Sequence, residues 1–143
     1  MSDRDAPITP GMQRYVDQNN AYLARRSEYI RSVVKRWKFD TIAVHGLYSV
    51  QEAIEDYQGS IIEPIFMSTS QAFRDSDEMA AALAYLIPSW SYSRIANPST
   101  YYYEWALALL EGYGFDGETS CCSTSSGMAA IMTAVQPFLM HTR

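Results

Sequence analysis

A run of small residues, a Ser/Gly turn and an apolar helical repeat constrain the fold of this 143-residue chain most. Thr119, Cys121 and Cys122 are small and fairly apolar, as a buried strand allows. A polar turn follows at 123–127. The apolar residues after it recur at the spacing of one helix face: Met128, Ile131, Met132 and Val135. The stretch Glu118–Leu139 therefore predicts a strand, a turn and a helix, which is the repeating unit of α/β folds.

The turn in this stretch can also bind an anion. Either Ser125 or Ser126 is a natural N-cap for the helix, and Gly127 allows close approach of the backbone. A helix N-terminus presents free N–H groups and the positive end of the helix dipole, so it can hold a phosphate. Alone the signal is weak, because most Ser/Gly turns before helices are only caps.

A long amphipathic helix is predicted at the start of the chain. Thr9 is a natural N-cap, and Pro10 suits the first helical position. Apolar side chains then recur every three or four residues, so the helix is expected over Gly11–Lys38. Its polar face, which we expect to be solvated or to face another subunit, carries five basic residues: Arg25, Arg26, Arg31, Lys35 and Arg36.

The middle of the chain predicts short helices separated by loops. Val44–Gly46 is expected to be a loop, and Val50–Asp56 a helical turn. Ser60–Phe73 is expected to be extended chain rather than a central strand, because Pro64 interrupts it. A cluster of acidic residues from Asp75 onward then predicts a helix that continues up to Pro88.

Two further helix boundaries follow from Pro and Gly. The segment Pro88–Asn97 is predicted to be a loop rich in aromatic and hydroxyl groups. Asn97 and Pro98 open the next helix, for which Gly112 is the predicted C-cap. The last helix is expected to fray before Pro137, since proline disfavours helical geometry at the residue that precedes it.

Charge, hydropathy and cysteine content exclude several classes of function. The first 40 residues hold eight basic and five acidic residues, whereas residues 41–143 hold three basic and eleven acidic ones. An acidic body would repel a nucleic-acid backbone, and no apolar run approaches the length of a membrane span. The adjacent Cys121 and Cys122 indicate reduced thiols and a cytoplasmic protein. No metal site is predicted, because the only histidines are His45 and His141.

Arg94 is the first candidate for chemistry. It is the only basic residue between Arg74 and Arg143, and it stands beside Tyr92 in the predicted loop. An arginine binds phosphate or carboxylate through two parallel bonds, and a tyrosine can add a hydroxyl. A surface arginine paired with one of the many acids explains the local pattern equally well. Similarly, Glu104 and Glu111 share a helix face, which indicates either a carboxylate pair or, more commonly, a solvated surface.

Several motifs together resemble a known enzyme family. They are, in chain order, TIAVHG (Thr41–Gly46), Gly59–Phe73, YSRIANPS (Tyr92–Ser99), Glu104, LALLEG (Leu107–Gly112) and SSGMAAI (Ser125–Ile131). The set is similar to the Cys/Met-metabolism, or trans-sulfuration, pyridoxal-phosphate enzymes. The resemblance implies an α/β fold, the incomplete N-terminal part of fold type I. Residues 1–60 would form a helical extension and arm, and residues 61–143 the start of the large cofactor-binding domain.

The resemblance also implies a cofactor, a site and partners. The cofactor is pyridoxal 5′-phosphate, whose phosphate the backbone N–H groups of Gly127 and Met128 would hold. Tyr92 and Arg94 would bind the same phosphate in the neighbouring subunit, so the active site is shared across a dimer within a homotetramer. The expected reaction makes or breaks a C–S bond at the γ-carbon of a homoserine- or cysteine-type amino acid. No nucleic-acid or membrane partner is expected.

The sequence departs from this family in three respects. Ser99 replaces the usual Thr, and Tyr103 replaces the usual Leu. The only lysines are Lys35 and Lys38, and neither lies in a matching motif, so the Schiff-base lysine is absent and no catalytic residue is assigned. We therefore expect an N-terminal segment that is inactive by itself. The alternatives are a truncated homologue that serves as a subunit-contact or regulatory module, and an unrelated phosphate-binding α/β domain.

Overall fold

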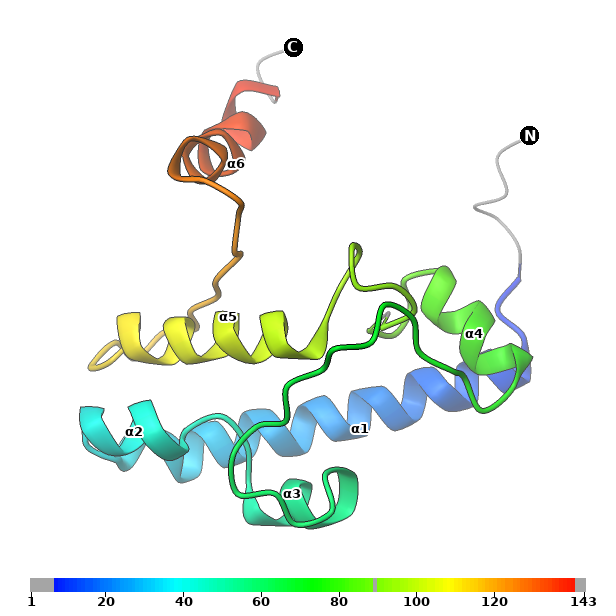
Figure 1. Ribbon diagram of the computed structural model, residues 1–143, viewed down its shortest axis with the longest axis horizontal. Coiled ribbons are helices and arrows are strands. Elements are labelled where there is room, and N and C mark those ends of the chain that lie inside the picture. Colours follow the sequence, from blue (N-terminus) through cyan, green and yellow to red (C-terminus); the bar gives the residue numbers. More distant parts are fainter. Residues whose placement is uncertain (1–6, 89, 141–143) are drawn as a thin grey trace.

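The computed structural model describes residues 7–88 and 90–140, and all regular elements in these ranges are helices (Figure 1). They are α1 (Pro10–Ser32), the 3-10 helix η2 (Val34–Arg36), α2 (Phe39–His45), α3 (Val50–Asp56), α4 (Ser76–Leu83), α5 (Pro98–Glu111) and α6 (Gly127–Met140). One isolated antiparallel bridge joins Ser70 to Tyr92. The α/β character that we predicted is therefore not visible in the described part of the chain.

The strand predicted at Thr119–Cys122 is wrong for this structure. The segment is extended, but no other described segment pairs with it, and a strand needs a neighbour to satisfy its backbone groups. Its polar contacts go instead to α5, where the Thr119 hydroxyl donates to the Ala108 carbonyl at 2.7 Å. The sequence has strand-like composition here, whereas strand formation depends on partners elsewhere.

Helix α1 begins as predicted and ends earlier than predicted. The Thr9 hydroxyl accepts a hydrogen bond from the Met12 N–H at 3.1 Å, and Pro10 occupies the first turn. The α-helix stops at Ser32 rather than at Lys38 and continues as the tighter turn η2. The β-branched Val33 and Val34 disfavour helix at this point. Val34 is fully buried, so packing compensates for the broken helix.

Helix α1 runs along the length of the body, with α4 and α5 above it and α3 below it in the view of Figure 1. It packs against α4, while α2 packs against α5. Nine hydrophobic side chains are buried between these elements: Tyr15, Val34, Ile42, Tyr48, Ala53, Ala81, Ala82, Tyr102 and Ala108. The core is small and rich in tyrosine and alanine, and its three tyrosine hydroxyls bond to Asp75, to the Ser60 carbonyl and to the Tyr57 hydroxyl.

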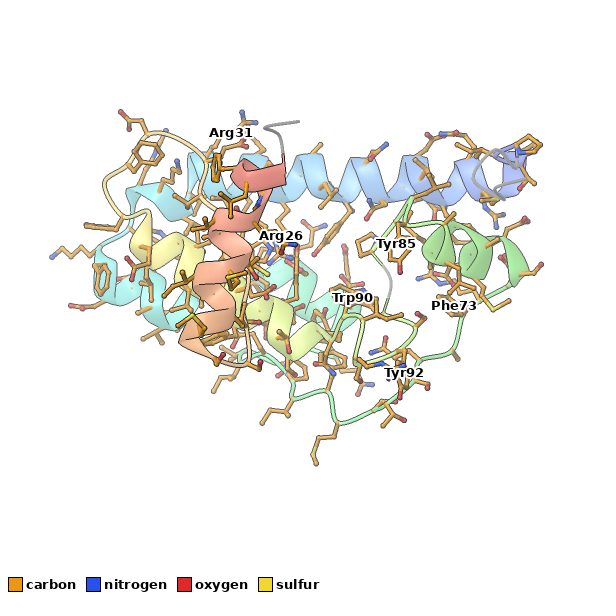
Figure 2. All side chains as sticks on the ribbon, turned by 90° about the horizontal axis from the view of Figure 1, so that it is seen from above. Arg26, Arg31, Phe73, Tyr85, Trp90 and Tyr92 are labelled. Atoms are coloured by element: carbon orange, nitrogen blue, oxygen red, sulfur yellow. The ribbon has the colours of Figure 1, made fainter. Side chains whose placement is uncertain are left out.

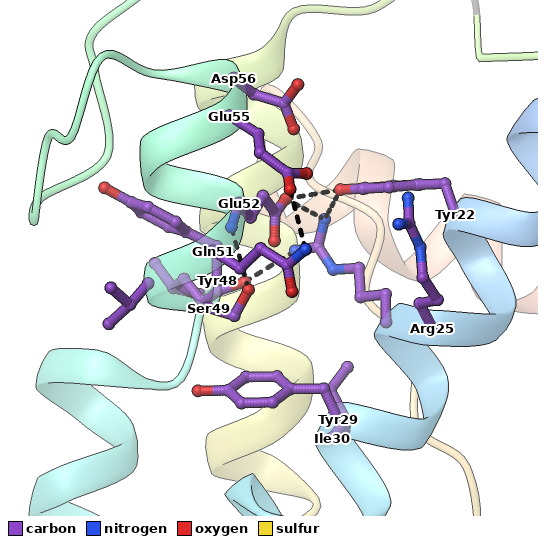
Figure 3. A pocket seen from close by; sticks show the side chains of 13 residues that line it. Tyr22, Arg25, Tyr29, Ile30, Tyr48, Ser49, Gln51, Glu52, Glu55 and Asp56 are labelled. Atoms are coloured by element: carbon purple, nitrogen blue, oxygen red, sulfur yellow. Dashed lines mark hydrogen bonds and ion pairs between the residues drawn. The ribbon is translucent and has the colours of Figure 1, made fainter.

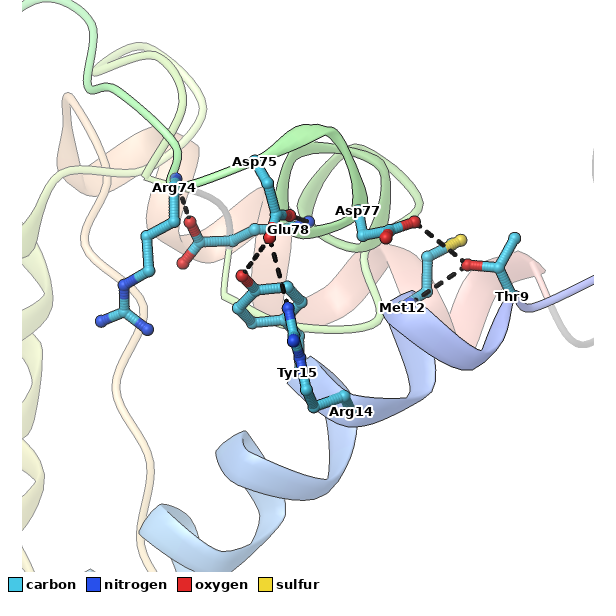
Figure 4. A network of polar contacts seen from close by, with 8 residues as sticks. All are labelled: Thr9, Met12, Arg14, Tyr15, Arg74, Asp75, Asp77 and Glu78. Carbon is cyan, nitrogen blue, oxygen red and sulfur yellow. Dashed lines mark hydrogen bonds and ion pairs between the residues drawn. The ribbon is translucent and has the colours of Figure 1, made fainter.

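Asp75 joins the N-terminal part of α1 to α4 (Figure 4). One carboxylate oxygen accepts from the Glu78 N–H at 2.9 Å and so caps α4, the helix that the acidic cluster predicted. The other accepts from the Tyr15 hydroxyl at 2.7 Å and from Arg14 at 3.2 Å. The bond from the Glu78 backbone, followed by the Tyr15 bond, lowers the pKa of Asp75 below its ordinary value.

The middle of the chain confirms some boundaries and corrects others. Val44 and His45 lie in α2 and not in a loop, because the Gly46 N–H closes the helix onto the Ile42 carbonyl at 2.9 Å and Ile42 is buried. Helix α3 is confirmed at Val50–Asp56. Helix α4 ends at Leu83, before Pro88, and Tyr85 has a positive φ of 58°.

The last two helices begin where their caps predict. Asn97 caps α5 through a 2.9 Å bond from the Ser99 N–H, and Gly112 is its C-cap. The preceding loop is confirmed apart from Ser89, which lies outside the described residues, as does His141. Helix α6 runs through Pro137 rather than fraying before it. Its described side chains are largely exposed, so water can solvate the carbonyl that a proline leaves without a donor.

Helix α6 stands apart from the other helices (Figure 1). An extended connection carries the chain away from the end of α5 before α6 begins. Large apolar side chains of α6 are consequently exposed: Met128, Ile131, Met132, Val135, Phe138 and Leu139. Among the described helices, none is both long and apolar enough to cross a membrane.

Candidate functional site

The N-terminus of α6 presents two backbone donors without acceptors in the described part of the chain. Ser126 is the N-cap, since its hydroxyl accepts from the Ala129 N–H at 3.2 Å and its carbonyl from the Ala130 N–H at 3.0 Å. These contacts leave the N–H groups of Gly127 and Met128 unpaired at the positive end of a 14-residue helix. Two free backbone donors are therefore available to an anion here.

Space around Gly127 fits this interpretation. A Cβ added at Gly127 would meet no atom within 4 Å, and the Met128 side chain is 68% exposed. The approach to both N–H groups is therefore open, as a phosphate would require. The residues present at this turn fit the phosphate of the implied cofactor.

The connection that leads into this turn is tied to α5 by a carboxylate. One Glu104 oxygen accepts from both the N–H and the hydroxyl of Ser123, each at 2.7 Å. The prediction that Glu104 lies on a solvated face is therefore wrong, and it forms no described contact with Glu111. Glu104 and Ser123 are both half-buried.

Tyr92 and Arg94 form the second part of the predicted site. The Arg94 guanidinium carbon lies 5.1 Å from the centre of the Tyr92 ring, and both side chains are exposed. No described carboxylate lies within ion-pair distance of Arg94, so its fork of N–H donors remains available. Of the two alternatives for Arg94, a surface arginine paired with an acid is not observed in the described residues.

Hydrogen bonds to residues 66–69 hold the loop that carries Tyr92 and Arg94. Ser93 donates its N–H to the Thr69 carbonyl at 3.0 Å and its hydroxyl to the Ser68 carbonyl at 2.5 Å. The Asn97 side-chain amide donates to the Phe66 carbonyl at 3.1 Å. Ser99, which stands in place of the family's threonine, accepts from the Phe66 N–H at 2.9 Å. The loop therefore holds Tyr92 and Arg94 outward on a supported backbone.

The structure does not bring the two parts of the predicted site together within one chain. Figures 1 and 2 show α6 apart from the loop that carries Tyr92. No described contact joins Tyr92 or Arg94 to Gly127 or Met128. This separation is compatible with the two parts serving different subunits, which stays a prediction.

A buried arginine is the main feature that the sequence reasoning missed. The Arg26 side chain is only 5% exposed, and its Nη1 lies 3.4 Å from Glu52 Oε1. Nη1 also donates to the Tyr22 hydroxyl at 2.8 Å, and Nη2 donates to the Leu47 carbonyl at 2.8 Å (Figure 3). The guanidinium carbon lies 4.5 Å from the centre of the Trp105 ring on α5. The predicted solvated or subunit-facing position of Arg26 is therefore wrong.

The spacing of α1 contains the signal that would have placed Arg26. It lies four residues after Tyr22 and three before Tyr29, which puts it within the apolar stripe. Burial raises the pKa of Tyr22 above its ordinary value, so the hydroxyl remains a neutral donor to Glu52, at 2.5 Å. Arg26 thus links α1, α3 and α5.

A cavity of about 420 Å³ lies beside this ion pair, between α1 and α3 (Figure 3). Some of its polar lining residues bond to one another, as in the 2.8 Å bond from the Gln51 side-chain amide to Glu55. None of Tyr92, Arg94, Gly127 and Met128 lines it. The cavity is therefore distinct from the predicted cofactor site. No group of three or more potential metal-ligating side chains occurs within the described ranges.

Comparison with known proteins agrees with these motifs. Residues 40–142 match the family described as Cys/Met metabolism PLP-dependent enzyme. The homocysteine/cysteine synthase of Kluyveromyces lactis is 38% identical over 104 residues, which cover 73% of this chain and 21% of that protein. No solved structure matches the chain.

Two further relatives are named for different activities. The O-succinylhomoserine sulfhydrylase of Pseudomonas aeruginosa is 34% identical over 97 residues, or 68% of this chain and 22% of the relative. The L-methionine gamma-lyase of Porphyromonas gingivalis is 33% identical over 97 residues, with the same two shares. The chain thus spans about a fifth of the length of these curated relatives. The family match covers most of the chain, which therefore belongs to the pyridoxal-phosphate-dependent enzymes of Cys/Met metabolism.

Proposed function

We propose that this chain is the N-terminal segment of an enzyme that makes or breaks a C–S bond at the γ-carbon of a homoserine- or cysteine-type amino acid. The observation that carries this proposal is the free N-terminus of α6, at a turn whose sequence matches the family. The relatives are a homocysteine/cysteine synthase, an O-succinylhomoserine sulfhydrylase and an L-methionine gamma-lyase. Because the chain spans only a fifth of their length, their activities support the class of reaction and leave the substrate open.

The roles of the chain's own residues follow from their chemistry. The Gly127 and Met128 N–H groups would hold the cofactor phosphate through the dipole end of α6. Tyr92 and Arg94 would donate to the same phosphate from the neighbouring subunit of a dimer within a homotetramer. When bound, pyridoxal phosphate supplies the electron sink that such reactions at an amino acid require.

We further propose the roles of the two halves of the chain. Residues 1–60 would form a helical extension and arm, and the long helix α1 is the observation in favour of this role. The open helix N-terminus at Gly127 supports residues 61–143 as the start of the large cofactor-binding domain. The adjacent free thiols of Cys121 and Cys122 favour a reducing compartment, and we propose the cytoplasm.

The chain by itself should bind the cofactor without turnover. Its only lysines are Lys35 and Lys38, and Lys35 Nζ already donates to the Gly117 carbonyl at 2.9 Å. The chain should be mixed with pyridoxal phosphate, reduced with borohydride and digested for mass spectrometry. We expect no stoichiometric adduct at any one lysine. A stoichiometric adduct at Lys35 or Lys38 would overturn the assignment of an inactive segment.

Binding of the phosphate itself can be tested with a matched pair of ligands and variants. Pyridoxal phosphate should bind the chain more tightly than pyridoxal, which lacks the phosphate. Arg94→Gln should weaken that preference in dimeric samples, as sized by light scattering, while Arg74→Gln in another exposed loop should leave it unchanged. Equal affinities for the two ligands would count against the proposed cofactor site.

A second candidate function is a non-catalytic subunit-contact or regulatory module. The observation that favours it is the exposed apolar surface of α6, on which Phe138 is 77% and Leu139 66% exposed. Size-exclusion chromatography with a full-length relative distinguishes the candidates. Co-elution as a defined hetero-oligomer supports the module, whereas separate elution of the two proteins contradicts it.

A further inference from the structure

We propose that Glu104 is a positioning residue that fixes the turn from which Gly127 and Met128 present their N–H groups to the cofactor phosphate. That a phosphate binds at this turn rests on the proposed function. That Glu104 positions the turn rests on the contacts that it makes from α5. Glu104 has no role in the reaction itself. It acts on the ligand only through the backbone that it holds.

The contacts of Glu104 are concentrated on one residue. A single carboxylate oxygen accepts both the N–H and the hydroxyl of Ser123 at 2.7 Å. Bonds to an ionised carboxylate are shorter and stronger than bonds between neutral groups. Because one of the two donors is backbone, the contact fixes the path of the chain as well as a side chain. Ser123 precedes the first residue of α6 by only four positions.

The other contacts around the turn cannot replace this one. The Thr119 hydroxyl also reaches α5, at the Ala108 carbonyl, but it lies eight residues before Gly127. Beyond Ser123 the hydrogen bonds described up to Val135 run within the segment itself, as from the Thr124 hydroxyl to the Ser126 carbonyl at 2.9 Å. The bond to Glu104 is therefore the last described anchor of the turn on the body.

The surroundings of Glu104 favour a positioning role over a charge-balancing one. The residue is half-buried, and no arginine, lysine or histidine forms an ion pair with it in the described residues. An acidic side chain without a structural role on a helix surface would be solvated. Here the two bonds from Ser123 stabilise the charge and offset the cost of partly burying it.

The test compares three variants of the full 143-residue chain. Glu104→Ala removes the acceptor, and Glu104→Gln restores an oxygen that can accept both bonds. Glu111→Gln, on the same helix and exposed, is the matched control. Two measurements apply to each: amide hydrogen exchange at Ser123, and the affinity for inorganic phosphate from chemical-shift changes of the Gly127 and Met128 amides.

We expect Glu104→Ala to accelerate exchange at Ser123 and to weaken phosphate binding, each by about tenfold or more. Amides within α5 should keep wild-type exchange, Glu104→Gln should recover most of both losses, and Glu111→Gln should match the wild type. Wild-type phosphate affinity in Glu104→Ala would overturn the inference, as would unchanged exchange at Ser123. If the wild-type chain binds no phosphate while Ser123 loosens in Glu104→Ala, the positioning stands and the proposed cofactor site falls.

Discussion

The substitution Glu52→Gln isolates the charge of the buried ion pair in this fold. Glutamine keeps the shape of the side chain and its ability to accept from the Tyr22 hydroxyl, but it removes the negative charge. The Arg26 side chain, which is 5% exposed, stays in place opposite residue 52, whose side chain is 9% exposed in the wild type. The variant therefore leaves a cation in the core without a counter-charge.

The expected cost follows from what Arg26 retains. Removing one partner of a buried ion pair destabilises a protein by roughly 3–5 kcal/mol. Arg26 still donates to Tyr22 and Leu47, each at 2.8 Å, and still faces the Trp105 ring. Its Nε has no described acceptor, so no further hydrogen bond offsets the loss of the counter-charge. We expect a loss of about 3 kcal/mol, at the low end of this range.

Urea unfolding followed by far-UV circular dichroism measures this loss. Glu55→Gln is the matched control, because it makes the same change on the same helix at an exposed position, and it should stay within about 0.5 kcal/mol of wild type. Adding Arg26→Met to Glu52→Gln should recover much of the loss, since no charge remains buried. If Glu52→Gln is as stable as Glu55→Gln, the charge of Glu52 does not stabilise this core.

Three further perturbations probe separate features. Folding lowers the pKa of Asp75 from 3.8, so the contribution of its carboxylate to stability is complete above about pH 4 and is lost as the pH falls through the folded pKa. Asp75→Asn should therefore flatten the fall in the urea midpoint between about pH 5 and pH 2. A curve parallel to that of the wild type would contradict this. Asn97→Asp keeps the cap of α5 but loses the donor to Phe66, so urea unfolding should show a cost of about 1 kcal/mol, and wild-type stability would refute a role for that bond. Gly127→Ala should leave the urea midpoint unchanged, because its Cβ meets no atom, yet weaken pyridoxal-phosphate binding about tenfold in a fluorescence titration; undiminished binding would argue against the site.

Helix starts were predictable because their causes are local. Four helices begin with a capping side chain, and the structure shows that each of these side chains accepts a hydrogen bond from a backbone N–H of its helix: Thr9, Asp75, Asn97 and Ser126. Such a bond spans two or three residues, so sequence alone contains both partners. The N-terminal turn of the candidate phosphate site could be predicted for the same reason.

Features that depend on distant residues were not predictable in this way. The small residues around Cys121 suit a strand, but a strand forms only beside another strand, which the described residues do not provide. Arg26 was placed on the solvated face by its charge, although its spacing put it among apolar neighbours. Its partners Glu52 and Trp105 come from other helices. A charged residue inside an apolar stripe indicates a buried pair, while the identity of its partner requires the fold.

The position of Arg26 also has a consequence for synthesis on the ribosome. Helix α1 is made before its partners, since Glu52 follows Arg26 by 26 residues and Asp75 follows Arg14 by 61. At about 5–20 residues per second, α1 waits several seconds for the residues that complete its surroundings. During that interval a guanidinium in the middle of its apolar stripe keeps the stripe hydrated, because burying it without a counter-charge is costly. We therefore expect the residue that anchors α1 in the finished fold to disfavour premature association of the nascent helix as well.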